Sequence, residues 1–277
     1  MRDLACGRFR LSLSRPLVMG IVNVTPDSFS DGGSFASVEA AVLQARRLLA
    51  EGADILDIGG ESTRPGATPV SLAVELDRVL PVIERLVDSS VPLSIDTYKP
   101  EVMGAALAAG ASMVNDVKAL REPGALELVA ATDAGVCLMH MQGDPQTMQM
   151  APQYADVVRE VESFLRDRVV ACERAGIARD RIVIDPGFGF GKSTAHNIAL
   201  LRDLERLSTL GVPVLAGLSR KSVLGKITDR EIGERVHSSV AAALVAVYRG
   251  AKIVRVHDVR ATRDALAIYE AVESSHD

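Results

Sequence analysis

Apolar residues occur in short runs rich in Val, Ile and Leu, and each run is followed by a stretch with helical spacing. Eight such runs are present, at residues 17–24, 55–60, 93–97, 113–117, 136–140, 182–187, 213–219 and 252–258. The helical stretches include residues 38–51, 72–88 and 157–176. Strands this apolar are typical of sheets covered on both faces, so the pattern predicts βα units around a parallel sheet.

Eight strands are the number that closes a TIM barrel, and we therefore expect an α/β fold of the (β/α)8 type. No linker or shift of composition divides the 277 residues, which predicts a single domain over 1–277 with its core at about 17–268. The first dozen residues are expected to form a short strand pair across the bottom of the barrel. An open, doubly wound sheet is the alternative.

Composition narrows the class of function. The net charge is −5, and no run rich in Lys and Arg with interleaved aromatics is present, which disfavours nucleic-acid binding. Cys6, Cys137 and Cys172 are far apart and form no C-x-x-C motif, which favours a reducing cytoplasm over a disulfide framework or a zinc site. Charged residues interrupt the first segment, and no later one is long and apolar enough to span a bilayer, so neither export nor membrane insertion is expected.

Polar residues stand at the ends of most of the predicted strands. They are Asn23, Glu61, Asp96, Asn115, Asp116, His140, Asp185, Arg220, Lys221, Arg255 and His257. The carboxyl ends of the strands share one face of a TIM barrel, and that face carries the chemistry. The spacing therefore predicts one site built from several strands.

Two explanations are open for several of these residues. Asp96, and likewise Asn115 with Asp116, can simply cap the next helix or turn. Asp185 differs, because a proline and glycines follow it and predict a loop. Arg255 and His257 are two apart in a strand and so point to the same side; a ligand or an internal salt bridge to a carboxylate accounts for a buried Arg.

The charges predict a ligand with an anionic part and a neutral part that forms hydrogen bonds. Guanidinium groups such as Arg64 and Arg255 can bind phosphate, whereas Asp96 and Asp185 can accept from adjacent N–H groups of a heterocycle. The helix expected after residues 219–222 offers a second anion site at Ser222. The glycine run 186–193 fits neither a P-loop nor a dinucleotide turn, and the histidines form no zinc motif.

Two long segments, MGIVNVTPDSFSDGG (19–33) and DIGGESTRPG (57–66), resemble the signature loops of dihydropteroate synthases. Shorter matches follow at SIDT (94–97), VNDV (114–117), CLMHMQ (137–142), DPGFGFGK (185–192), GLSRKS (217–222) and IVRVHD (253–258). The resemblance implies a transferase of folate biosynthesis. It would condense 6-hydroxymethyl-7,8-dihydropterin diphosphate with p-aminobenzoate, giving 7,8-dihydropteroate and diphosphate.

The resemblance also assigns roles to residues. Pterin binding falls to Asp96, Asn115, Met139, Asp185, Lys221 and Arg255. Diphosphate binding falls to Asn23, Arg64, Arg255 and His257, with a Mg²⁺ ion reached through Asn23. The p-aminobenzoate site is formed by Phe29, Thr63, Pro65, Phe190, Lys221 and Ser222. Catalysis is expected to depend on Asp96, Lys221, Arg255, His257 and Arg64.

The same resemblance implies a cytoplasmic homodimer joined through the later helices, with sulfonamides as competitors of p-aminobenzoate. Two alternatives are a pterin-binding paralogue without activity and a methyltetrahydrofolate-dependent methyltransferase domain. The second lacks the two long loops, and intact Asn23, Thr63, Arg64 and His257 argue against the first.

Overall fold

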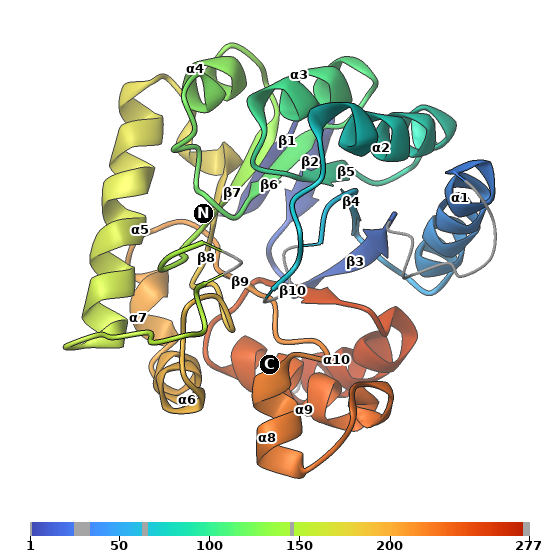
Figure 1. The fold of residues 1–277 in the computed structure, drawn as a ribbon. Helices are drawn as coiled ribbons and strands as arrows, with labels where there is room; N and C mark the ends of the chain where they lie inside the picture. The colour runs from blue at the N-terminus through green and yellow to red at the C-terminus, as the bar shows by residue number, and fades with distance from the viewer. Residues whose placement is uncertain (1, 25–33, 63–65, 145–146, 274–277) are drawn as a thin grey trace.

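The computed structural model describes residues 2–24, 34–62, 66–144 and 147–273. Eight parallel strands form a barrel within them (Figure 1). They are β3 (Leu17–Asn23), β4 (Ile55–Gly59), β5 (Leu93–Asp96), β6 (Met113–Asp116), β7 (Gly135–Met139), β8 (Ile182–Asp185), β9 (Leu215–Ala216) and β10 (Ile253–Val256). Their spatial order is β8-β7-β6-β5-β4-β3-β10-β9, and a bridge between Ile184 and Val214 brings the two ends together. The TIM-barrel prediction is confirmed, and the open sheet is excluded.

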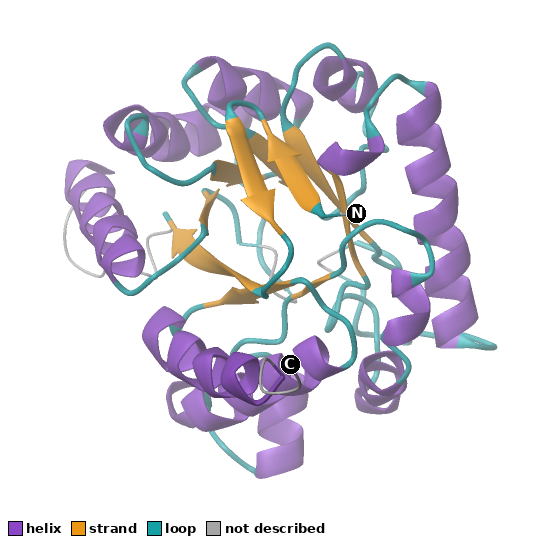
Figure 2. Cartoon of the chain, turned by 180° about the vertical axis from the view of Figure 1, so that it is seen from behind, coloured by secondary structure: helices purple, strands orange, loops and turns teal. Residues whose placement is uncertain are grey.

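Helices surround the barrel (Figure 2). They are α1 (Ser34–Ala50), α2 (Leu72–Leu86), α3 (Pro100–Ala108), α4 (Ala125–Ala130), α5 (Val157–Arg174), α6 (Thr194–Arg202), α7 (Glu205–Ser208), α8 (Ser222–Thr228), α9 (Val236–Tyr248) and α10 (Val259–Glu273), with 3-10 helices at Arg179–Arg181 and Ile232–Glu234. None of the helices in the described ranges has the length and apolar character needed to cross a bilayer.

The bottom of the barrel is closed by the predicted strand pair. β1 (Asp3–Cys6) and β2 (Phe9–Ser12) run antiparallel across this end of the barrel (Figure 2). Their residues Leu4 and Cys6 pack against an apolar floor. The floor consists of inward-facing strand residues: Leu17, Met19, Ile55, Met113, Cys137, Val183, Leu215 and Ile253. Residues of opposite parity, such as Val18 and Leu56, face the helices and form the larger core. Because side chains alternate along a strand, the floor fixes which residues further up point into the barrel.

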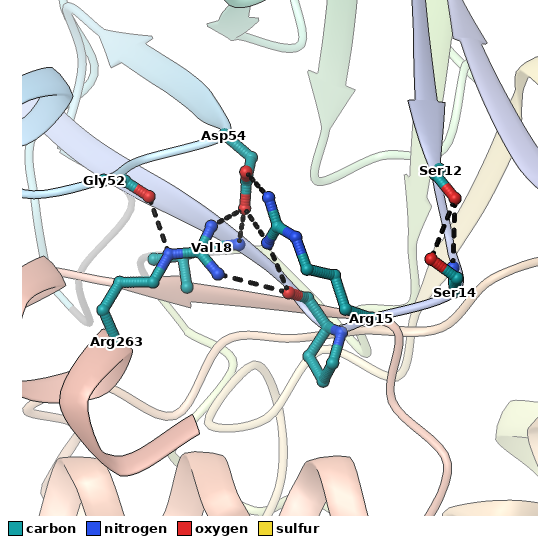
Figure 3. A network of polar contacts seen from close by, with 8 residues as sticks. Ser12, Ser14, Arg15, Val18, Gly52, Asp54 and Arg263 are labelled. Carbon is teal, nitrogen blue, oxygen red and sulfur yellow. Dashed lines mark hydrogen bonds and ion pairs between the residues drawn. The ribbon is translucent and has the colours of Figure 1, made fainter. Parts of the chain in front are cut away.

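An ionic network fastens the amino-terminal ends of β3 and β4 to α10 (Figure 3). Asp54 accepts from Arg15 Nη2 over 2.7 Å, from the Val18 backbone N–H over 2.8 Å and from the Arg263 guanidinium. Arg263 also donates from Nε to the Gly52 carbonyl over 2.7 Å. These contacts stabilise the end of the barrel opposite the polar strand ends.

Candidate active site

Above the apolar floor, the inward positions of the barrel become polar. In four strands, the residue two positions after an apolar floor residue is polar: Asp57 follows Ile55, Asn115 follows Met113, Asp185 follows Val183 and Arg255 follows Ile253. Side chains two apart lie on the same face of a strand. The structure therefore directs these polar groups toward the axis at one end of the barrel, which we call the barrel mouth.

Arg255 connects three strands at the barrel mouth. Its Nε donates to Asp57 Oδ2 and its Nη2 to Asp96 Oδ2, each over 2.6 Å, and Asn115 Nδ2 donates to Asp57 Oδ2 over 3.0 Å. Burial opposes the charge of Arg255, but Asp57 and Asp96 outweigh it and raise the pKa of the guanidinium. Arg255 is therefore a permanent cation with a fixed orientation.

Asp57 was not predicted as a site residue, although it is fully buried and accepts two of these hydrogen bonds. The available signal was a charged residue inside the apolar run 55–60. A buried carboxylate is costly unless it is paired. Its position therefore required a cation on a neighbouring element, which Arg255 supplies.

A second group lies around Gly217, on the chain that follows β9. A Cβ atom placed on Gly217 would lie 3.8 Å from Asp185 Oδ2, 3.9 Å from Lys221 Nζ and 3.9 Å from Arg255 Cβ. Asp185 Oδ1 accepts from the Gly187 backbone N–H over 2.7 Å. The structure thus brings Asp185, Lys221 and Arg255 together within reach of one small molecule.

Burial shifts the pKa values of Asp96, Asp185 and Lys221 in the direction that favours the uncharged form of each side chain. It raises the pKa of Asp96 to about 7, although Arg255 acts in the opposite direction. The pKa of Asp185 is also raised by burial, against the attraction of Lys221. Burial lowers the pKa of Lys221 to about 8, against the attraction of Asp185. The barrel mouth therefore contains groups that change charge close to neutral pH.

His257 lies beside this cluster and is held by Ser219. Ser219 Oγ accepts from the His257 backbone N–H over 3.1 Å and lies 3.0 Å from ring Nδ1. The two contacts to one hydroxyl hold both the backbone and the ring of His257 in place. Ser219 belongs to the segment GLSRKS (217–222), but the sequence did not predict a role for it.

An apolar patch borders the same end of the barrel. Met139, Met141, Met148 and Val117 pack together, with Tyr98 and Phe190 against them. The Lys221 ammonium lies 4.6 Å from the centre of the Phe190 ring, and Lys221 Nζ also donates to the Phe188 carbonyl. Polarisable sulfur atoms and an aromatic ring suit the face of a flat heterocycle or a benzene ring.

Four polar strand ends are engaged in other contacts. Asp116 accepts from the Lys118 and Leu120 backbone N–H groups, each over 2.7 Å, so the turn explanation is correct for it. His140 packs edge-on against Phe164 at 4.9 Å, on the outward face of β7. The other two residues form ion pairs: Arg220 pairs with Asp258, and Glu61 pairs with Lys99.

The remaining predicted residues divide into two sets. Asn23 is at the end of β3, paired in register with Gly59, which is itself paired with Asp96. Ser222 is the exposed first residue of α8, directly after Lys221, as predicted. The other set lies outside the described residues: Phe29, Thr63, Arg64 and Pro65.

Comparison with known proteins points to one family. A model described as "Pterin binding enzyme" matches residues 19–257. A dihydropteroate synthase of Neisseria meningitidis serogroup B is 55% identical over 273 residues, covering 96% of each chain. Dihydropteroate synthase structures from Xanthomonas albilineans superpose with TM-scores of 0.94 (61% identity, with 4-aminobenzoic acid) and 0.90 (58% identity, with 7,8-dihydropteroate), each covering 98% of both chains. The Yersinia pestis enzyme in a sulfonamide complex is 49% identical, with a TM-score of 0.93 over 98% of this chain and 99% of that one.

Proposed function

This chain belongs to the dihydropteroate synthase family, and we propose on that premise that it condenses 6-hydroxymethyl-7,8-dihydropterin diphosphate with p-aminobenzoate. The products are 7,8-dihydropteroate and diphosphate. The observation that carries the proposal is the meeting of Asp185, Lys221 and Arg255 around Gly217, beside Asp96 and Asn115. Acids there can hold a heterocycle and cations can receive an anionic leaving group.

The pterin is assigned to the deeper part of the barrel mouth. Asp96, Asn115, Asp185 and Lys221 bind the edge of its ring, while Met139 and Arg255 lie against its faces. Carboxylates accept from the adjacent N–H groups of such an edge, and the amide and ammonium groups donate to its nitrogen and oxygen acceptors. Asn115 and Arg255 are already held in place by Asp57, which supports their role as preorganised contacts.

The diphosphate is assigned to Asn23, Arg64, Arg255 and His257. Two of the five N–H groups of the Arg255 guanidinium bind carboxylates in the described part of the chain, so the fork has further donors for phosphate oxygens. His257 adds an imidazole ring that Ser219 holds in place. The p-aminobenzoate contacts are Phe29, Thr63, Pro65, Phe190, Lys221 and Ser222, of which Phe190 and Lys221 are in contact with each other.

The proposed reaction needs no protein nucleophile. The bond between the pterin methylene carbon and the diphosphate oxygen breaks, and the electron pair leaves with diphosphate, whose charge Arg64, Arg255 and His257 neutralise. The electron-rich dihydropterin carries the positive charge that develops on the methylene, and the Asp96 carboxylate stabilises it. The aryl amine then attacks the methylene carbon and loses a proton.

Magnesium would be held chiefly by the substrate. Within the described ranges there is no group of three or more His, Cys, Asp or Glu residues that could hold a metal. Asn23 offers one amide oxygen, and Mg²⁺ commonly takes one or two protein ligands together with substrate phosphates, so this donor set fits. When bound, the ion would neutralise part of the diphosphate charge.

We also propose a cytoplasmic homodimer. Large apolar side chains are exposed on α8, α9 and α10, which lie together on one side of the barrel (Figure 1); they include Ile227, Val245, Tyr248 and Ile268. The three cysteines are buried free thiols, which supports a reducing compartment. Light scattering would test the dimer, since Tyr248→Glu with Ile268→Glu should give monomers.

The function is tested by incubating the purified protein with the pterin diphosphate, p-aminobenzoate and Mg²⁺. We expect 7,8-dihydropteroate and diphosphate in equal amounts, and sulfonamides should compete with p-aminobenzoate. Tight binding of the pterin diphosphate without product would favour a paralogue that lacks activity. Methyl transfer from methyltetrahydrofolate would favour the methyltransferase alternative.

A further inference from the structure

Lys192 follows the loop that comes after β8, and none of the proposed reaction steps involves it. It is only 2% exposed, and its Nζ has three neighbours that can accept a hydrogen bond. These are His140 Nδ1 at 2.9 Å, the His140 carbonyl at 3.2 Å and the Phe190 carbonyl at 2.9 Å. An ammonium group has three N–H donors, so each donor has an acceptor. The lysine thereby connects the end of β7 to the loop that follows β8.

That loop, residues 187–191, is held by contacts with several other segments, and Lys192 supplies the side-chain hydrogen bond to the Phe190 carbonyl. Gly187, Gly189 and Gly191 all have positive φ angles, of 69°, 82° and 61°. A Cβ on Gly187 would be 1.9 Å from the His140 carbonyl oxygen, and one on Gly191 would be 2.3 Å from that of Gln142. The glycines let two backbone segments approach closely, but they also leave the unbound loop with many conformations.

The loop carries the side of the site assigned to the aryl amine. The Phe190 ring contacts Lys221 Nζ and packs in the patch with Met148, while the Phe188 carbonyl accepts from Lys221 Nζ. Lys192 holds the carbonyl of Phe190 itself. A shift of this carbonyl would therefore move the ring and its contact with Lys221.

His140 is suited to be a fixed acceptor. Burial, together with the cation of Lys192, lowers the pKa of His140 to about 3, so the ring is neutral. Its Nδ1 then accepts from Lys192 and its proton is on Nε2. The ring also packs edge-on against Phe164 of α5, with an interplanar angle of 89°.

We propose that Lys192 is a positioning residue, anchored on His140, which fixes the 187–191 loop and Phe190 so that the site binds the aryl amine. The inference rests on the proposed function for its kinetic consequence only. In the described part of the chain, Lys192 Nζ forms hydrogen bonds with His140 and Phe190 and with none of the residues assigned to the pterin. Its charge nevertheless acts on the pterin residue Asp185 and helps to lower the pKa of that carboxyl against the effect of burial. Its loss should therefore weaken amine binding through the displaced Phe190, and weaken pterin binding by a smaller factor through the lost electrostatic effect on Asp185.

The test compares Lys192→Met with Lys226→Met, which removes an exposed lysine from α8. Burial lowers the pKa of Lys192 to about 7, so the assays are run at pH 6.5, where the ammonium form prevails. We expect the KM for p-aminobenzoate to rise about 10- to 100-fold in Lys192→Met, the loss typical of hydrogen bonds from a charged donor. The Kd for the pterin diphosphate should rise by a smaller factor than this KM, and Lys226→Met should match the wild type.

Hydrogen exchange of the unliganded protein gives an independent readout. Amides of residues 187–191 should exchange faster in Lys192→Met but not in Lys226→Met. An inactive wild type would count against the proposed function, while this exchange experiment would still decide the positioning role. Equal losses of amine and pterin binding, or unchanged amine KM and exchange, would overturn the inference.

If Lys192→Met does not fold, His140→Leu and His140→Gln decide the matter. Leucine removes the ring acceptor but leaves the backbone carbonyl for Lys192, and it should raise the amine KM about 3- to 10-fold. Glutamine also lacks the ring but offers a side-chain oxygen, so it should restore part of the affinity. The same KM in both variants and the wild type would contradict the anchoring by His140.

Discussion

Arg255 Nε donates to Asp57 Oδ2 over 2.6 Å, although 198 positions separate the two residues along the chain. Asp57 is fully buried, so the ion pair lies at the edge of the barrel core rather than on its surface. The contact fixes the guanidinium while Nη2 reaches Asp96. Stability and proposed chemistry therefore depend on the same side chain.

Replacing Arg255 with Met should lower the free energy of unfolding by about 3–5 kcal/mol, because it leaves the buried Asp57 charge uncompensated. The double variant Asp57→Asn with Arg255→Met should recover part of that loss but none of the turnover. Urea denaturation and diphosphate release would measure the two effects. A double variant less stable than Arg255→Met alone would contradict this account of the pair.

Replacing Asp185 with Asn keeps the shape of the side chain and removes its charge. The affinity for the pterin diphosphate should fall about 10- to 100-fold, the value of a hydrogen bond to a charged group. Stability should not fall, because burial already raises the pKa of Asp185 and so disfavours its ionised form. Calorimetric titration showing wild-type affinity would remove Asp185 from the pterin site.

Gly217 and Gly187 make a matched pair for substitution by Ala. A methyl group on Gly217 meets its neighbours at ordinary contact distances, so the fold should tolerate it, but it would stand between Asp185, Lys221 and Arg255. Pterin affinity should drop at least about 10-fold without a change in melting temperature. Gly187→Ala should instead lower the melting temperature, because its methyl group would overlap the His140 carbonyl.

The pH dependence of kcat/KM for the pterin diphosphate should be bell-shaped. Below about pH 7 Asp96 becomes protonated and loses its acceptor role, and above about pH 8 Lys221 loses its charge. Asp96→Asn should remove the acid limb from the residual activity and leave the basic limb. An acid limb of the same midpoint in both proteins would assign it to the substrate instead.

The same ionisation should appear in stability. The pKa of Asp96 in the folded protein lies above its ordinary value, so the folded state binds this proton more tightly than the unfolded state does. The resulting stabilisation is fully present below the ordinary pKa and is lost as pH rises through about 7. The wild type should therefore lose stability relative to Asp96→Asn between about pH 4 and 7. Urea midpoints measured across this range would test the sign.

Asp54 provides a structural control far from the barrel mouth. Asp54→Ala leaves the Val18 N–H without its acceptor and removes the carboxylate that pairs with the Arg263 guanidinium, which should cost about 1–3 kcal/mol of unfolding free energy. Substrate KM values should stay at wild-type levels, since the network lies at the opposite end of the barrel. Altered KM values would show that the two ends are coupled.

The sequence by itself determined the eight strands and the end of the barrel at which polar residues collect. Apolar runs separated by helical stretches require parallel strands, and parallel strands in one barrel present their carboxyl ends on one face. Local alternation also determined that Arg255 and His257 point to the same side. These features depend only on neighbours along the chain.

The tertiary structure alone decided which polar residues enter the barrel. Asp57 points inward because it follows the inward residue Ile55 by two positions. Asp116 and His140 point outward because each follows an inward residue, Met113 or Cys137, by three positions. A strand buried on both faces is apolar at positions of both parities, so its sequence does not reveal which parity faces the axis. That parity, and with it the pairing of Asp57 with Arg255, is set only when the strands pack against the floor and the helices.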